Sequence, residues 1–176
     1  MSLDLANYEK KTRKAVRHFW KQRESASSKN SSSTKRDQGE RGAVINNFNN
    51  RTEEALGTAV DIWTAYREGA FGHGAPQPFV GWLMLLEDAE GATRPSRLES
   101  SPHFNLFPEF VKASYSRRYE LLCQKLVREQ HYTAAALLLS PREKGSSGSY
   151  RELSEDTGIK AFLGRIAAFA AAEAIK

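Results

Sequence analysis

Carboxylates placed near lysines are the residues of this chain with the clearest potential for chemistry. Glu9-Lys10-Lys11 has Glu-x-Lys spacing, and Glu53 and Glu54 are adjacent. Such groups can hold a divalent cation that polarises an oxygen and activates water. Neither set brings further carboxylates with it. A solvated helix face is the simpler account of Glu9, and helix capping is the simpler account of Glu53 and Glu54. The last two are therefore candidates for an auxiliary catalytic role only.

Polar amides and basic residues form a second group with chemical potential. Amide side chains can contact adenine edges or phosphates, and arginine suits guanine or phosphate. The amide-rich run consists of Asn46, Asn47, Asn49, Asn50 and Arg51. Nonspecific phosphate contacts are expected from Lys10, Lys14, Arg17 and Lys21. Turn and cap formation is an equally good account of the asparagines, and a solvated helix face is the competing account of the lysines.

The histidines and the single cysteine do not suggest a metal site. His18, His73, His103 and His131 include no pair at ligand spacing on one helix. One cysteine, Cys123, allows neither an internal disulfide nor a cysteine-based zinc site, and it is expected to be buried and inert. We therefore expect no metal ligands among these residues.

Charge is distributed unevenly along the 176 residues, although the formal net charge is only +5. Residues 1–36 hold ten Lys and Arg against three Asp and Glu, whereas residues 37–176 hold sixteen against eighteen. A basic segment on a near-neutral body suits contact with a polyanion, because neutralising phosphates releases counterions. No apolar run approaches the roughly 20 residues of a membrane span. The lone cysteine and the absence of a signal-like apolar stretch favour a cytoplasmic protein.

Three segments are predicted along the chain. Residues 1–24 form a basic helix, because apolar side chains recur at helical spacing between lysines and arginines. Residues 25–45 form a serine-rich linker, since little there can be buried to offset the entropy of ordering. Residues 46–176 form the remaining folded body.

Within that body the pattern predicts helix, strand, helix, strand, helix. A capping box of Asn50 and Glu53 should open a helix over about 52–68. The apolar run 79–86 follows Pro78 and reads as a strand buried on both faces. A loop over 89–108, a helix over 111–129, a strand over 133–140 and a final helix over 158–175 complete the series. Such alternation implies parallel strands with crossover helices, which is an α/β fold. Two strands alone make a marginal sheet, so both are expected to have further neighbours.

Several stretches resemble the XhoI-like family of type II restriction endonucleases. The most specific are Asn46–Gly57 (Asn-Asn-Phe-Asn-Asn-Arg-Thr-Glu-Glu-Ala-Leu-Gly), Asp61–Phe71 and Tyr115–Glu129, with further agreement in 37–44, 78–88 and 102–141. The resemblance runs through most of the chain in the same order.

This resemblance implies a cytoplasmic homodimer that cuts double-stranded DNA at a short palindrome, CTCGAG, using Mg²⁺. It implies a PD-(D/E)xK nuclease core: a short mixed sheet flanked by helices, here with a basic helix at the N-terminus. The first strands of that core would carry an Asp and a Glu-x-Lys as metal ligands and charge stabiliser.

This chain departs from the family pattern where those ligands are expected. Val44-Ile45 joins two of the matching stretches directly, without room for the catalytic strands. The sequence thus predicts a restriction endonuclease by descent that is catalytically defective. A noncatalytic DNA-binding or dimerising remnant is the alternative. A third reading is a longer enzyme whose middle part is missing from this sequence, which the intact mass and the encoding DNA would reveal.

Overall fold

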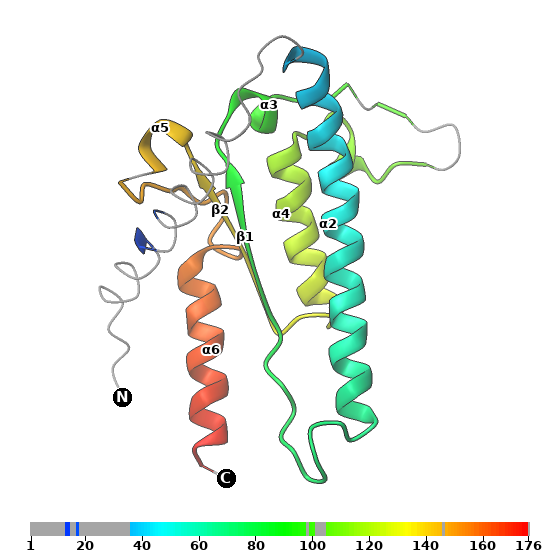
Figure 1. Ribbon diagram of the computed structural model, residues 1–176, viewed down its shortest axis with the longest axis vertical. Coiled ribbons are helices and arrows are strands. Elements are labelled where there is room, and N and C mark those ends of the chain that lie inside the picture. Colours follow the sequence, from blue (N-terminus) through cyan, green and yellow to red (C-terminus); the bar gives the residue numbers. More distant parts are fainter. Residues whose placement is uncertain are drawn as a thin grey trace.

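The computed structural model describes residues 13, 14, 17, 36–97, 99–100, 105–145 and 147–175. Two strands alternate with helices along this part of the chain (Figure 1). The elements are α2 (Arg36–Arg67), β1 (Gly81–Glu87), α3 (Glu90–Thr93), the 3-10 helix η1 (Pro108–Phe110), α4 (Tyr115–Arg128), β2 (Ala134–Ser140), α5 (Arg142–Gly145) and α6 (Ile159–Glu173). The predicted α/β class is confirmed.

The two strands form a parallel sheet, as the alternating pattern predicted. Their register runs from Gly81 opposite Ala134 to Glu87 opposite Ser140. Val80 accepts a hydrogen bond from Thr133, and Asp88 donates one to Ser140. Even-numbered residues of β1 therefore direct their backbone groups at β2, and Gly81, Leu83 and Leu85 direct theirs at the other edge. Among the described residues, no strand pairs with that edge of β1.

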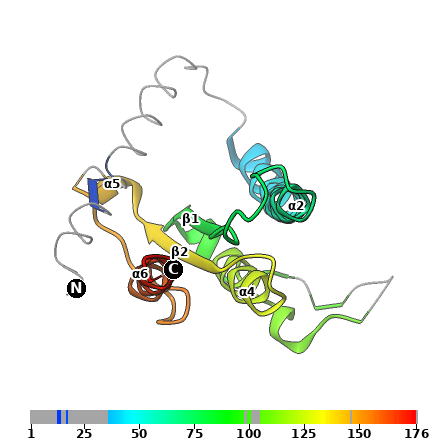
Figure 2. The ribbon, with the colours of Figure 1, turned by 90° about the horizontal axis from the view of Figure 1, so that it is seen from below.

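Helices cover the two faces of the sheet unequally. Viewed end-on, α6 lies on one side of the strands, whereas α2 and α4 lie on the other (Figure 2). A Cβ at Gly81 would come within 3.0 Å of Phe162, so the odd-numbered side of β1 faces α6. The even-numbered side chains Trp82, Met84 and Leu86 pack against the core shared with α2 and α4.

The core is centred on β2, in which every residue is buried. Leu137 and Leu139 of this strand pack with Tyr119, Cys123 and other buried residues of α4. The apolar character of β2 makes this possible, because a strand buried on both faces needs no polar side. On the outer edge of β2, Leu139 pairs with Arg151 in an isolated antiparallel bridge.

Strand β1 is less buried than the sequence predicted. Its residues are exposed or only partly buried, and Leu83 retains 48% of its accessible surface. The expectation of burial on both faces is wrong for this strand. The physical reason is its open edge, together with partial coverage of the face that it turns to α6.

Helix α2 begins much earlier than the capping-box pattern indicated. It runs without interruption from Arg36 to Arg67, so its first ten residues lie in the segment predicted as a linker. Asn50 is inside the helix and cannot be its N-cap, which requires non-helical backbone angles. Residues 36–45 contain good helix formers such as Arg, Gln, Glu and Ala and no proline, so the helix can propagate through them.

The predicted helix over 111–129 is shorter at its N-terminus than expected. Lys112 has a positive φ of 54°, which is incompatible with a helix at that point. Ser114 is the N-cap of α4, and its side chain accepts a hydrogen bond from the backbone N–H of Arg117 at 3.2 Å. The stretch predicted as a loop over 89–108 contains the short helix α3 and the first residue of η1.

Most of the predicted basic helix over 1–24 lies outside the described residues. Residues 13, 14 and 17 are helical. The division of the chain into three segments stays a prediction. No described helix combines the length and the apolar character needed to cross a membrane.

Candidate functional site

The carboxyl ends of β1 and β2 lie at the same end of the sheet because the strands are parallel. In open α/β sheets this is the end where ligands usually bind. Here Asp88 follows β1 and accepts two hydrogen bonds from Arg151, from Nε at 2.6 Å and from Nη2 at 2.7 Å. These hydrogen bonds raise the pKa of Arg151. Both carboxylate oxygens of Asp88 are engaged, so this group is not available to a cation in this conformation.

Glu53 and Glu54 do not form a carboxylate pair on one surface. Both are exposed on α2, and neighbouring helical residues point about 100° apart. The carboxylate of Glu54 forms a salt bridge with Arg51 one turn earlier. In the described part of the chain, no group of three or more His, Cys, Asp or Glu side chains is arranged to hold a metal.

The predicted amide-rich contact run is helical rather than a loop before a helix. Residues Asn46 to Arg51 all lie within α2. The side chains of Asn47, Asn49 and Asn50 are exposed, and the side chain of Asn46 lies outside the described part. Turn and cap formation, the competing account of these residues, is therefore wrong. Exposed amides on a helix surface remain able to contact a partner.

Arg51 is exposed on α2, close enough to the core for its charge to act on Tyr119. Phe48 packs edge-on against Tyr119, with ring centroids 4.9 Å apart. Burial raises the pKa of Tyr119 to about 12, and the charge of nearby Arg51 opposes that rise. The Arg51 side chain is 52% exposed and forms a salt bridge with Glu54. Arg51 is thus a positive charge at the surface of α2.

The four basic residues predicted to contact phosphates can be located only in part. Lys14 and Arg17 are helical and exposed. Lys10 and Lys21 lie outside the described residues. The neighbouring Arg13 lies over the ring of Tyr150, at 5.7 Å from its centroid. This contact places the described N-terminal residues beside the segment that follows α5.

A basic cluster that the sequence reasoning missed lies around the start of α4. We call it the 94–118 cluster, and it consists of Arg94, Arg97, Lys112, Arg117 and Arg118. Arg118 donates to the hydroxyl of Ser96 at 2.9 Å, and the backbone N–H of Ser96 donates to Lys112 at 3.1 Å. These bonds hold the loop after α3 against α4. Figure 1 shows α3 and the first turn of α4 near the end of β1.

The charges of this cluster are only partly compensated. Lys112 pairs with Glu99 at 3.0 Å, and Arg117 pairs with the buried Glu120 at 2.7 Å. Arg118 lies over the ring of Tyr115, and its buried Nε–H has no hydrogen-bond partner among the described residues. Arg94 and Arg97 are exposed. The signal that could have revealed this cluster is Arg94-Pro-Ser-Arg97 combined with Arg117-Arg118 at a helix start.

Cys123 is buried, as the sequence indicated, and the backbone of His131 contributes to packing. Cys123 is fully buried in the core, and burial raises the pKa of its thiol to about 12. Such a thiol is almost entirely protonated near neutral pH and is a poor nucleophile. The backbone carbonyl of His131 accepts a hydrogen bond from the indole N–H of Trp63 at 2.8 Å.

Comparison with known proteins finds one matching family model and several similar proteins. The model of the family described as "Restriction endonuclease XhoI" matches residues 42–152. The chain is 48% identical over 129 residues to the type II restriction enzyme BstVI of Geobacillus stearothermophilus. This alignment covers 73% of this chain and 57% of that relative. It is 54% identical over 96 residues to the type II restriction enzyme XhoI of Xanthomonas vasicola, covering 54% of this chain and 38% of that relative.

A third similar protein is the type II restriction enzyme AbrI of Azospirillum brasilense. It is 38% identical over 173 residues, an alignment that covers 59% of this chain and 77% of that relative. The chain spans less than two thirds of the lengths of the BstVI and XhoI enzymes. No solved structure matches this chain.

Proposed function

Because this chain belongs to the XhoI family of restriction endonucleases, we propose that it descends from a type II site-specific deoxyribonuclease of a restriction–modification system. The relatives at 48% and 54% identity are type II restriction enzymes, which supports this descent. Its partner is double-stranded DNA in the cytoplasm. Its site, by resemblance, is the palindrome CTCGAG, which suits a homodimer because a two-fold protein matches a two-fold site.

We further propose that this chain cannot cleave DNA because the segment with the catalytic carboxylates is missing. The observation that carries this proposal is the helical path of the chain through Val44, Ile45 and Asn46, where the family pattern expects strands. The open edge of β1 is consistent with absent neighbouring strands. What remains is part of a PD-(D/E)xK core.

The length of one alignment supports the same proposal. The match to the AbrI enzyme extends over 173 positions, yet 59% of this chain is only about 104 residues. Roughly 70 positions of that alignment therefore face no residue of this chain. A gap of this size is large enough for several strands of about 5–6 residues with their turns.

The described residues do not fit the Mg²⁺ site that the family implies. Mg²⁺ prefers carboxylate oxygens with near-octahedral geometry. Asp88 is held by Arg151, Glu54 by Arg51, and Glu120 by Arg117. Each of these carboxylates already has a cationic partner, so none is poised to receive a metal. We therefore derive no metal-dependent step for this chain.

The DNA-contacting surface is proposed to combine the 94–118 cluster with the exposed amides of α2. Arg94 and Arg97 are exposed, and the loop that carries them is anchored to α4 through Ser96 and Arg118. Fixed arginines lose less conformational entropy on binding a phosphate than mobile ones. Lys14 and Arg17, which are exposed, are proposed to add sequence-independent contacts. This surface supports a DNA-bound state even without cleavage.

A DNA-cleavage assay tests the loss of activity. A linear duplex with one CTCGAG site is incubated with the protein and either Mg²⁺ or Mn²⁺, and a family enzyme that cuts this duplex is the positive control. We expect intact DNA at all protein concentrations. Defined double-strand cuts would refute the proposed loss. Calorimetric titration with Mg²⁺ should show no heat of binding, as is also expected for the alternative, a noncatalytic binding or dimerising remnant. A saturable heat would reveal a surviving metal site and contradict both.

DNA binding is tested by fluorescence anisotropy with two short duplexes, one containing CTCGAG and one containing its scrambled form. The double variant R94Q/R97Q should weaken binding to both and reduce the slope of log K against log salt by about 2. The variant K160Q removes a lysine from exposed α6, away from the cluster, and serves as the matched control. Equal losses for K160Q and the double variant would refute the assignment of this surface.

A further inference from the structure

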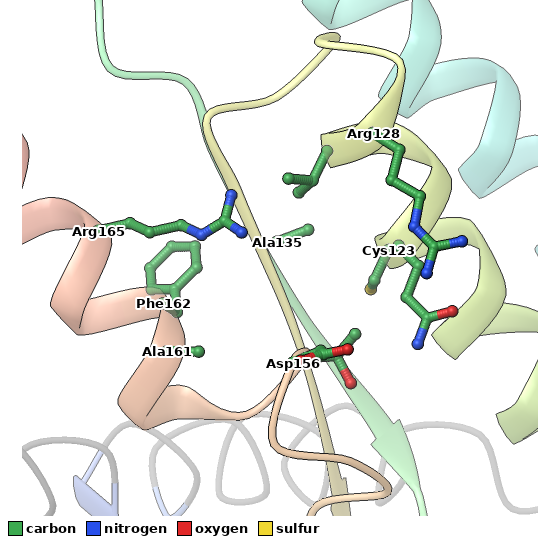
Figure 3. A pocket seen from close by; sticks show the side chains of 10 residues that line it. Cys123, Arg128, Ala135, Asp156, Ala161, Phe162 and Arg165 are labelled. Atoms are coloured by element: carbon green, nitrogen blue, oxygen red, sulfur yellow. The ribbon is translucent and has the colours of Figure 1, made fainter.

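A cavity between α4, β2 and α6 brings together polar side chains that the proposed DNA contact does not use. Its volume is about 250 Å³. Figure 3 shows Arg128 extending from α4 and Arg165 extending from α6, on opposite sides of β2, with Asp156 below them. The remaining lining residues are Cys123, Gln124, Val127, Ala135, Thr157, Ala161 and Phe162.

The position of this cavity follows from incomplete coverage of the outer edge of β2. Leu137 is hydrogen-bonded to Thr157 and Leu139 to Arg151, so that edge is covered toward the carboxyl end of β2. The backbone of Ala135 points toward the same edge, because residues alternate along a strand. Ala135 is 5% exposed and lines the cavity. A bound molecule could therefore meet one backbone donor and one acceptor there.

Arg165 is held in place by the backbone. Its Nη1 donates a hydrogen bond to the carbonyl of Thr133 at 2.9 Å, which fixes the guanidinium beside the cavity. Arg165 also lines a second cavity of about 220 Å³, together with Trp63, Tyr132 and Val127. A guanidinium has five N–H donors, so most remain available after this single bond. Arg165 is thus held beside the cavity while most of its N–H donors remain available to a ligand.

Asp156 does not neutralise these arginines. Among the described residues, no salt bridge joins Asp156 to Arg128 or Arg165. The cavity therefore presents two separated positive charges and one separate acceptor. Guanidinium groups bind phosphate and carboxylate through paired N–H donors. Phe162 and Val127 add an apolar wall, as small-molecule sites usually have.

We propose that this cavity binds a small anionic molecule whose phosphate or carboxylate group lies between Arg128 and Arg165. A hydroxyl or amino group of the same molecule would donate to Asp156. The site is independent of DNA binding, because none of its residues belongs to the 94–118 cluster or to the amide-rich face of α2. Inorganic phosphate and acetate are the simplest probes for the oxyanion part of the ligand.

Nuclear magnetic resonance titration of the full chain tests the site. Phosphate should shift the amide signal of Ala135 and the Nε–H signal of Arg165, whereas the amide of Leu83 on the free edge of β1 should not move. Acetate in a parallel titration distinguishes the two chemistries, and the tighter probe identifies the group that the site prefers. Absence of a saturable shift at Ala135 with both probes would overturn the proposal.

Variants that remove one positive charge distinguish specific anion binding in the cavity from a general attraction of anions to the protein. R128Q and R165Q should each weaken binding of the tighter probe by about tenfold or more, because each removes the charge-assisted hydrogen bonds of one guanidinium. K160Q removes one positive charge from α6 outside the cavity lining and should leave the affinity unchanged. R128Q is the safer variant, because Arg128 is exposed and its loss should not unfold the chain. Equal weakening by K160Q would show nonspecific attraction and refute the site.

Discussion

The free edge of β1 should make this protein associate with itself, and one substitution tests that idea. Leu83 lies in the middle of β1, directs its backbone groups at the open edge, and retains 48% of its accessible surface. An exposed apolar edge strand is a template for pairing with another chain. Replacing Leu83 with lysine adds a charge at this edge while leaving the pairing of β1 with β2 in place.

The expected loss of stability is small. Complete burial of a leucine contributes about 1.5–3 kcal/mol, and Leu83 is only about half buried. The side chain therefore contributes roughly 1 kcal/mol, part of which the aliphatic stem of lysine retains. L83K should lower the free energy of unfolding by less than about 1 kcal/mol. Two chains paired through their β1 edges would in contrast bring two lysines close together, and like charges there disfavour pairing.

The assay compares aggregation at equal protein concentration by light scattering and sedimentation velocity. L83K should aggregate several times more slowly than the original chain. V60K is the matched control, because Val60 is 53% exposed and lies on α2 rather than on the sheet edge. Both variants exchange one exposed aliphatic residue for lysine, so net charge changes equally. Equal slowing in V60K, or unchanged aggregation in L83K, would refute the role of the edge.

Three further predictions concern the core and the carboxyl end of the sheet. Y132F removes the hydrogen bond from the buried Tyr132 hydroxyl to the carbonyl of Ala55 at 2.8 Å and should destabilise the fold by about 0.5–1.5 kcal/mol in urea unfolding, because that carbonyl lies inside α2 and keeps its helical partner. The pKa values of Cys123 and Tyr119 are raised to about 12, so between about pH 9 and 12 the folded state keeps protons that the unfolded state loses. The free energy of unfolding should therefore be full below about pH 9 and fall between about pH 9 and 12. A pH series of unfolding curves checks this, and a flat profile would contradict it. R151Q breaks the salt bridge with Asp88 and should lower the free energy of unfolding by about 1 kcal/mol at most, since 47% of the arginine side chain is exposed. Limited proteolysis should then cut more readily near 149–157. Unchanged cleavage would argue that the salt bridge does not hold this segment.

The parallel strand pair was predictable from the sequence because each strand is a short apolar run bounded by proline or polar residues. Strand β2 matches its predicted range within one residue. Its complete burial fits the apolar residues 134–139, and the hydroxyl of Ser140 donates to the carbonyl of Ser149. Strand β1 has similar composition, yet its burial differs. Burial depends on which neighbours are present, and composition does not reveal whether an edge is occupied.

The start of α2 was not predictable from local signals. Asn50 and Glu53 have the spacing of a capping box, and the asparagines at positions 46, 47 and 49 suggested a turn before it. A helix that is already formed by packing from Phe48 onward can extend toward its N-terminus at little cost, because propagation is easier than nucleation. Tertiary packing therefore overrode a cap signal that would be sound in isolation.

The candidate site was predictable only in part, for a related reason. Arg94 and Arg97 are separated from Arg118 by more than twenty positions in the sequence, and they are brought together by contacts of Ser96 with Arg118 and Lys112. Sequence spacing cannot show such an approach. The carboxylates show the opposite case: Glu53 and Glu54 are adjacent in sequence, but helical geometry separates them and Arg51 holds Glu54.

The packing of α2 explains how a fold of this kind can lose a segment before Asn46 and keep its core. Side chains of α2 reach the core from Phe48 to Trp63, about 16 residues or ~24 Å of helix, close to the ~21 Å length of α4. The junction at Val44–Asn46 lies before Phe48 in the sequence. A deletion that ends there removes possible neighbours of the β1 edge and leaves the described core residues in the chain. On this reasoning the proposed loss costs the protein its sheet partners and its metal ligands, while β1, α4 and β2 keep the contacts that hold them together.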